Sequence, residues 1–130
     1  MQDKELTEKI SGCGFNVYNR MGFGFLESVY EKCLIIELKN SNVKAESQVP
    51  ISVSYDDTLV GDFYADILVE DHVILELKSV RQLARAHEVQ LVNYLVATGK
   101  EVGLLLNFAE EKVQVKRKIR RLEDEPTGNL

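Results

Sequence analysis

The chain has little cysteine and no long apolar segment, and these two features exclude several kinds of site and classes of protein. Its two cysteines, Cys13 and Cys33, lie in helical apolar patterns and are too far apart for a Cys-x-x-Cys ligand pair. We therefore expect reduced core thiols rather than a disulfide, zinc or iron–sulfur site. No charged segment followed by an apolar core opens the chain, and no apolar run approaches a membrane span. These absences predict a cytoplasmic protein without membrane contacts.

Basic residues are also scarce relative to acidic ones. There are 16 of the former and 21 of the latter, which gives a formal net charge of −5. A protein that coats nucleic acid through bulk electrostatics needs the opposite balance. Two local exceptions are the pair Arg81 and Arg85, and a basic cluster at 116–121. A solvated strand edge is an equally good explanation of that cluster.

A length of 130 residues with 45% hydrophobic content predicts one domain, which we place at residues 1–122. Residues 123–130 contain proline and glycine and are expected to form a flexible tail. Apolar residues at helical spacing predict helices over residues 5–21, 26–39 and 83–97. Alternating or continuous apolar runs predict strands over residues 43–55, 58–60, 63–69, 73–78, 102–108 and 113–119. Pro50 indicates an edge strand, and Gly61 indicates a bulge. This order predicts an α/β (α+β) fold with a mixed sheet flanked by helices.

The runs at 63–69 and 73–78 are separated by a short polar loop and predict a β-hairpin. If Val69 and Val73 flank the loop, the register pairs Leu68 with Ile74 and Ile67 with Leu75. The next pair is Asp66 with Glu76. Because side chains alternate between the two faces of a sheet, Asp66, Glu76 and Lys78 should project from one face.

Opposed carboxylates repel each other, and burial in an apolar strand makes the pair more costly. Lys78 supplies one compensating charge, and a divalent cation would supply the rest. The alternative is that these three residues form only a solvated face or a structural charge network.

Two helices carry further polar residues. His87, Gln90 and Tyr94 follow helical spacing and line one side of the third helix, whereas Leu91, Val92, Leu95 and Val96 occupy the apolar arc. Such a polar stripe is commonly a solvated face. Glu88 falls inside the apolar arc and has no explanation from the sequence. Glu27, in the first turn of the second helix, either complements the helix dipole or reaches toward a metal on the sheet.

Several of these segments together resemble one protein family. The run at residues 24–30 has the Gly-x-x-Glu-x-x-Tyr form that gives the GxxExxY family its name. The resemblance continues through residues 61–66, 76–78, 87–94 and 103–108. It covers roughly residues 4–122, and five weak motifs in this order are together specific.

The GxxExxY family is similar to a branch of the PD-(D/E)XK nuclease superfamily. The resemblance implies a restriction-endonuclease-like α-β-β-β-α-β core, here with an extra N-terminal helix. It matches Asp66, Glu76 and Lys78 to the superfamily's acidic residue and E-x-K pattern. Glu27 matches the helical glutamate of RecB-like members, and Gln90 with Tyr94 matches their Q-x-x-x-Y helix. Ala65 stands where the pattern has proline.

These matches imply a metal-dependent nuclease that acts on DNA more readily than on RNA. Glu27, Asp66, Glu76 and the carbonyl of Leu77 would hold Mg²⁺ or Mn²⁺ through oxygen ligands. The implied catalytic residues are Asp66, Glu76, Lys78, Gln90 and Tyr94, and the implied substrate-binding residues are His87, Arg81 and Arg85.

Other readings stay open at this point. The chain could be a catalytically silent module that keeps the fold to bind nucleic acid or another protein. With its Pro50 edge strand it could also form a homodimer or dock onto a larger partner.

Overall fold

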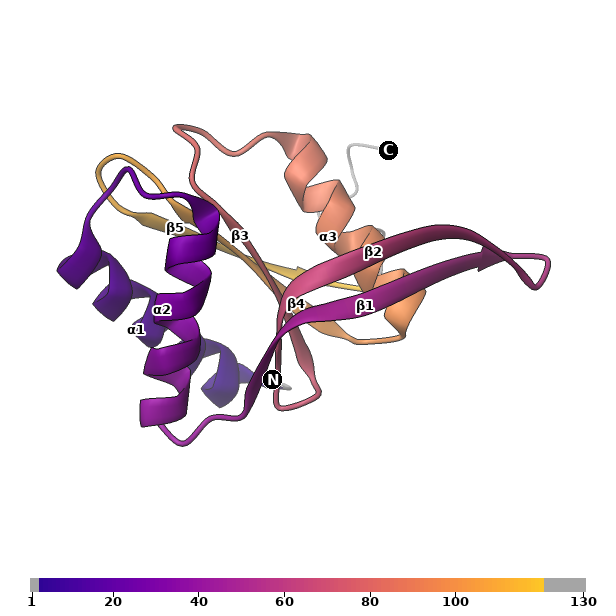
Figure 1. Cartoon of the computed structure of the whole chain (residues 1–130), viewed down its shortest axis with the longest axis horizontal. Coiled ribbons are helices and arrows are strands. Elements are labelled where there is room, and N and C mark those ends of the chain that lie inside the picture. Colours follow the sequence, from indigo (N-terminus) through magenta and orange to yellow (C-terminus); the bar gives the residue numbers. More distant parts are fainter. Residues whose placement is uncertain (1–2, 121–130) are drawn as a thin grey trace.

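The structure is a computed structural model that describes residues 3–120, and its helices cover both faces of one twisted sheet (Figure 1). The helices are α1 (Lys4–Met21), α2 (Glu27–Asn40) and α3 (Arg85–Thr98). The strands are β1 (Ala45–Tyr55), β2 (Thr58–Val69), β3 (Val73–Lys78), β4 (Val102–Phe108) and β5 (Val113–Ile119). The tail predicted at 123–130 lies outside the described residues.

The five strands are ordered β1-β2-β3-β4-β5 across the sheet. All neighbours are antiparallel except β3 and β4, which are parallel and joined through α3. Every residue of β4 is buried, as its continuous apolar run predicted. The predicted fold class is therefore confirmed, including the α-β-β-β-α-β order and the extra N-terminal helix.

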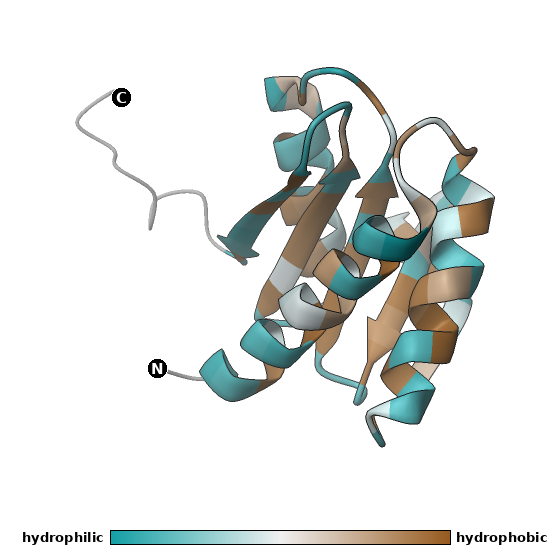
Figure 2. Ribbon diagram, turned by 90° about the vertical axis from the view of Figure 1, so that its left-hand side faces the viewer, coloured by the Kyte–Doolittle hydropathy of each residue, from teal (hydrophilic) through white to brown (hydrophobic). Residues whose placement is uncertain are grey.

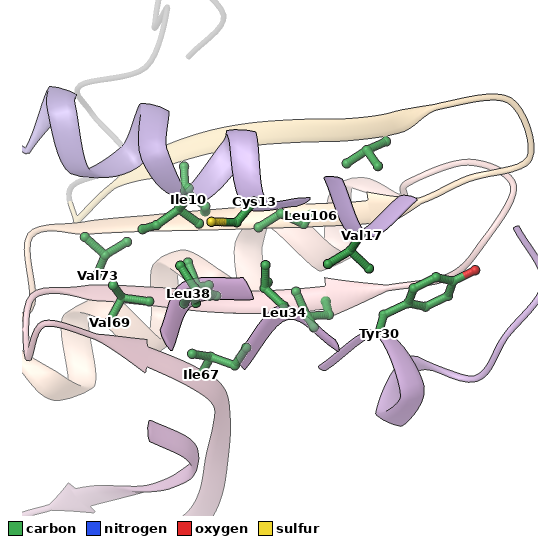
Figure 3. Packing of buried hydrophobic residues seen from close by; sticks show 14 of the residues in the cluster. Ile10, Cys13, Val17, Tyr30, Leu34, Leu38, Ile67, Val69, Val73 and Leu106 are labelled. Atoms are coloured by element: carbon green, nitrogen blue, oxygen red, sulfur yellow. The ribbon is translucent and has the colours of Figure 1, made fainter. Parts of the chain in front are cut away.

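Helices α1 and α2 cover one face of the sheet. Their apolar sides pack with every second residue of the central strands (Figure 3). The buried cluster includes Ile10, Cys13, Val17, Tyr30, Leu34, Leu38, Ile67, Val69, Val73 and Leu106. Cys13 and Cys33 are free thiols, of which Cys13 is buried and Cys33 is half-buried at the edge of this cluster. In Figure 2 the central strands are largely apolar, whereas hydrophilic residues are concentrated on the helices and at the ends of the strands.

Helix α3 covers the opposite face. Leu91, Tyr94 and Leu95 pack against strand residues such as Ile74 and Leu105. Gly103 permits this close approach, because a Cβ at that position would lie 2.8 Å from Leu91 Cδ1. None of the helices among residues 3–120 has the length and apolarity that a membrane crossing requires.

The β1–β2 hairpin extends well beyond the rest of the sheet as an arm (Figure 1). Strand β3 pairs only with the last three residues of β2, whereas β1 pairs along nearly the whole of it. A register shift between Val53 and Ser54 leaves Val60 unpaired, next to the bulge predicted at Gly61. Pro50 lies in β1, an edge strand, as predicted. The arm and the sheet thus diverge, and the candidate site lies where β2 and β3 separate.

Candidate active site

Strands β2 and β3 separate at the predicted carboxylate pair. The three predicted pairs Ile67–Leu75, Leu68–Ile74 and Val69–Val73 are confirmed, but Asp66 and Glu76 do not continue the ladder. Each carboxylate instead accepts a backbone hydrogen bond from the other strand. The N–H of Leu77 donates to Asp66 Oδ2 at 2.7 Å, and the N–H of Asp66 donates to Glu76 Oε2 at 3.0 Å.

This exchange fixes the orientation of both carboxylates. It satisfies backbone donors that the end of the ladder would otherwise leave unpaired, and it uses only one oxygen of each carboxylate. A short hydrogen bond to a charged acceptor is among the stronger ones in proteins. The fork between β2 and β3 is therefore a rigid mount for two acidic side chains.

The surroundings of the fork do not balance the negative charge of two ionised carboxylates. Glu76 is only 6% exposed, and burial followed by repulsion from Asp66 raises its pKa from 4.5 to about 8. Burial likewise raises the pKa of Asp66. Lys78 lies close enough to lower the pKa of both carboxyl groups, yet it does not offset burial. A second positive charge at this point would stabilise the ionised pair.

The donor set fits a hard divalent cation. Asp66 and Glu76 offer carboxylate oxygens, which Mg²⁺ and Mn²⁺ prefer, and a Mg²⁺ site commonly keeps several waters besides one or two carboxylates. Within residues 3–120, no three histidine, cysteine or acidic side chains converge tightly enough to form a complete cage. The protein would thus supply part of the coordination, and water or a phosphate would supply the remainder.

The raised pKa of Glu76 predicts how the free energy of unfolding depends on pH in metal-free buffer. Between pH 5 and 8 folded Glu76 keeps a proton that the unfolded chain has lost, so the free energy of unfolding should fall as pH rises. The expected slope reaches about 1.4 kcal/mol per pH unit. Urea unfolding with EDTA from pH 5 to 9 measures it, and Glu76→Gln should flatten most of it. Stability that rises with pH over this range would contradict the raised pKa.

The Gly-x-x-Glu-x-x-Tyr segment forms the loop that leads into α2. The Tyr30 hydroxyl donates to the carbonyl of Gly22 at 2.5 Å and accepts from the N–H of Phe25 at 3.3 Å. Its ring stacks on Phe108 with a centroid distance of 4.3 Å. The Ser79 hydroxyl donates to the Phe25 carbonyl at 3.1 Å, which ties this loop to the end of β3. The tyrosine of the motif is therefore structural, and it sets where α2 begins.

Helix α2 brings two glutamates toward the fork. Glu27, its first residue, is exposed and adds to the repulsion that raises the pKa of Glu76. Glu31 lies one turn later and was missed by the sequence reasoning. Burial raises the pKa of Glu31, and repulsion from Asp66 raises it further. The signal was available, because residues i and i+4 share one helix face.

On the other side of the fork, α3 contributes Tyr94. Its pKa is raised by burial and then by the charges of Glu76 and Asp66, which places it beside both carboxylates. Its ring centroid lies 5.7 Å from that of Phe63 on the arm. Tyr94 and Gln90 also line an open groove of about 1200 Å³ between the arm and α3. Other residues of its lining are Ser52, Ser54, Phe63, Asn93 and Val96.

The neighbouring residues of α3 have structural partners. The Ala84 N–H donates to His87 Nδ1 at 3.1 Å, so His87 caps the start of the helix. Glu88, unexplained by the sequence, forms an ion pair with Lys118 of β5 at 3.0 Å and lies 4.0 Å from Lys116. Part of the basic cluster at 116–121 therefore faces α3, and Arg121 lies outside the described residues. The substrate-binding role of His87 stays a prediction.

Arg81 and Arg85 lie exposed around the segment that joins β3 to α3. That segment is held by Asn107, a fully buried residue of β4 that the sequence reasoning did not single out. The Val80 N–H donates to Asn107 Oδ1 at 2.9 Å, and Asn107 Nδ2 donates to the Val80 carbonyl at 2.9 Å and to Gln114 Oε1 at 2.8 Å. Asn107 thereby fixes the chain two residues after Lys78.

We expect Asn107→Leu to lower the free energy of unfolding by roughly 3 kcal/mol, because it leaves buried backbone and amide groups without partners. Urea unfolding followed by circular dichroism measures the loss. Gln114→Met removes only one of the three bonds and should cost about 1 kcal/mol. Equal losses in the two variants would show that the Val80 clamp adds little.

Comparison with known proteins adds two findings. A family model described as the PD-(D/E)XK nuclease superfamily matches residues 4–122. Among solved structures, the crystal structure of SSO0001 is similar over 93% of this chain, with a TM-score of 0.59 and 16% identity. The chain spans 61% of the length of that protein, and at this identity the likeness concerns the fold alone. No curated protein matches the chain.

Proposed function

Because the chain belongs to the PD-(D/E)XK nuclease superfamily, we propose that it hydrolyses phosphodiester bonds with the help of Mg²⁺ or Mn²⁺ at the fork between β2 and β3. The observation that carries the proposal is the pair of carboxylates oriented by exchanged backbone bonds, beside Lys78 and short of positive charge. A purely structural charge network would pair each carboxylate with a cation from the chain. Here the available lysine does not offset burial.

In the proposed site Asp66, Glu76 and the Leu77 carbonyl would hold the cation, and Glu27 of α2 would supply a further oxygen ligand. The cation would polarise a phosphate oxygen and make water a stronger nucleophile at neutral pH. Lys78 would orient the attacking water or stabilise the negative charge that develops as the water oxygen bonds to phosphorus and the P–O bond breaks. Without the cation the fork offers a phosphate only Lys78 beside carboxyl groups, so phosphate should bind well only after the cation.

Further residues would hold the substrate. Tyr94 and Gln90 line the groove next to the fork and would position the phosphate backbone. Arg81, Arg85 and His87 lie around the start of α3 and would contact phosphates on either side of the cut. These contacts would let an acidic protein bind nucleic acid locally. We further propose the GxxExxY branch with a RecB-like pattern, DNA as the preferred substrate, and a cytoplasmic location.

The test is cleavage by the full chain. Supercoiled, linear and single-stranded DNA, and a single-stranded RNA, are incubated with Mg²⁺ or Mn²⁺, and a parallel reaction contains EDTA. We expect cleavage of DNA that EDTA abolishes. Cleavage that survives in Lys78→Ala or Glu76→Ala would point to a contaminating nuclease. Mn²⁺ binding without cleavage of any substrate would favour a silent binding module. Size-exclusion chromatography of the same samples tests whether the chain forms a homodimer.

A further inference from the structure

Gln48 of β1 has a backbone conformation that a regular strand does not need. Its φ is +55°, in the left-handed region that costs a residue with a side chain on the order of 1 kcal/mol. The ladder with β2 pairs Ser47 with Ile67 and Val49 with Ala65, but it omits the intervening pair of Gln48 with Asp66. The strained residue is therefore the one that faces a carboxylate of the fork.

The side chain of Gln48 connects two elements of the candidate site. Gln48 Nε2 donates to Glu31 Oε1 at 3.0 Å and to Oε2 at 3.2 Å. A hydrogen bond from Gln48 also lowers the pKa of Asp66, so the same side chain serves carboxylates of both α2 and β2. Since Glu31 and Asp66 repel each other, a neutral donor between them reduces that repulsion.

We propose that Gln48 is a positioning residue whose left-handed conformation holds the carboxylate of Glu31 beside Asp66, so that α2 contributes to cation binding at the fork. The inference rests on the proposed function and deepens it. It assigns to Glu31 a part in binding the cation, in addition to Glu27.

Two variants separate the effect of the backbone conformation of Gln48 from the effect of its side-chain amide. Gln48→Ala and Gln48→Gly both remove the amide, but only glycine relieves the positive φ. In EDTA the glycine variant should therefore have the higher urea midpoint of the two. Both should bind Mn²⁺ about tenfold more weakly than wild type by isothermal titration, as expected when a hydrogen bond to a charged group is lost. Ser47→Ala, at the adjacent exposed position, should bind as wild type does.

The result that would overturn the inference is Mn²⁺ affinity that follows stability, with the glycine variant binding like wild type. A second measurement does not use metal. In a double-mutant cycle of Gln48→Ala and Glu31→Ala, unfolded in EDTA, the two substitutions should be clearly non-additive. Additive effects would reject the contact that holds Glu31. If wild type binds no Mn²⁺ while the cycle shows coupling, the metal site of the proposed function fails, and with it the cation-binding role of Gln48, although the contact itself is supported.

Discussion

Glu76→Gln should abolish measurable Mn²⁺ binding, with a loss of affinity of at least about 100-fold. An amide has nearly the same shape and can still accept the hydrogen bond from the Asp66 N–H, but it carries no charge to attract a cation. Loss of one full charge in a buried site weakens electrostatic attraction far more than the same change at the surface. Isothermal titration of metal-free protein with Mn²⁺ measures the effect.

A matched control removes one negative charge from an exposed position on β2, outside the fork. Asp62 lies on β2 four residues before Asp66 and is exposed, so Asp62→Asn should leave Mn²⁺ affinity within about twofold of wild type. Both variants should remain folded by circular dichroism. If Glu76→Gln binds Mn²⁺ as tightly as Asp62→Asn does, the carboxylate pair is not a metal site.

The Glu76→Gln substitution also links the site to stability. Above pH 8 the wild-type protein without metal holds an ionised, buried Glu76, whereas the variant holds a neutral amide. We therefore expect the variant to be the more stable of the two in EDTA at alkaline pH. This pattern, in which a change stabilises the chain and destroys binding, is typical of residues kept for function.

The register of the hairpin could be predicted from alternation alone. A register shift of one residue would have moved Ile67 and Leu75 from the core face to the opposite face of the sheet. Such a shift is unfavourable because both side chains would leave the core. The end of the ladder could not be predicted in this way. Whether Asp66 and Glu76 form a regular pair depends on how far the arm bends from β3, and that bend involves β1 and its unpaired position at Gln48.

Other features depended on contacts between distant segments. Glu88 appeared misplaced in an apolar arc because its partner, Lys118, comes from β5 and is thirty residues away. Val96 was placed in the apolar arc but is 61% exposed, because α3 turns that side toward the groove beneath the arm. Position 26 was predicted to begin the second helix, but Leu26 precedes α2 and is exposed. Periodicity identifies a helix and its apolar side, but it does not show where the neighbouring layer stops.

Glu31 and Gln48 illustrate two kinds of omission. Glu31 could have been found, because it follows Glu27 by one helical turn and shares its face. Gln48 could not, since its role depends on a left-handed backbone angle that nothing in the local sequence demands. Glycine or asparagine would have signalled such an angle. A glutamine there becomes informative only when its partners are known.

Lys78→Met should reduce the rate of DNA cleavage by at least about 1000-fold while Mn²⁺ affinity stays within a few fold of wild type. Methionine keeps much of the length and apolar stem of the lysine but removes the charge. The charge of Lys78 lowers the pKa of both Asp66 and Glu76, so Lys78 lies near them. An ammonium group has no lone pair and cannot be a metal ligand. Its contribution would therefore fall on water orientation or on charge that develops during the reaction.

The split between binding and rate distinguishes this role from a structural one. If Lys78 only balanced the two carboxylates, its removal would strengthen cation binding and leave cleavage at saturating Mn²⁺ unchanged. Single-turnover cleavage at several Mn²⁺ concentrations separates these outcomes. Lys78→Arg retains the charge but presents a planar, bulkier group, so it should recover only part of the rate. Full cleavage by Lys78→Met would contradict the mechanism even if the metal site were correct.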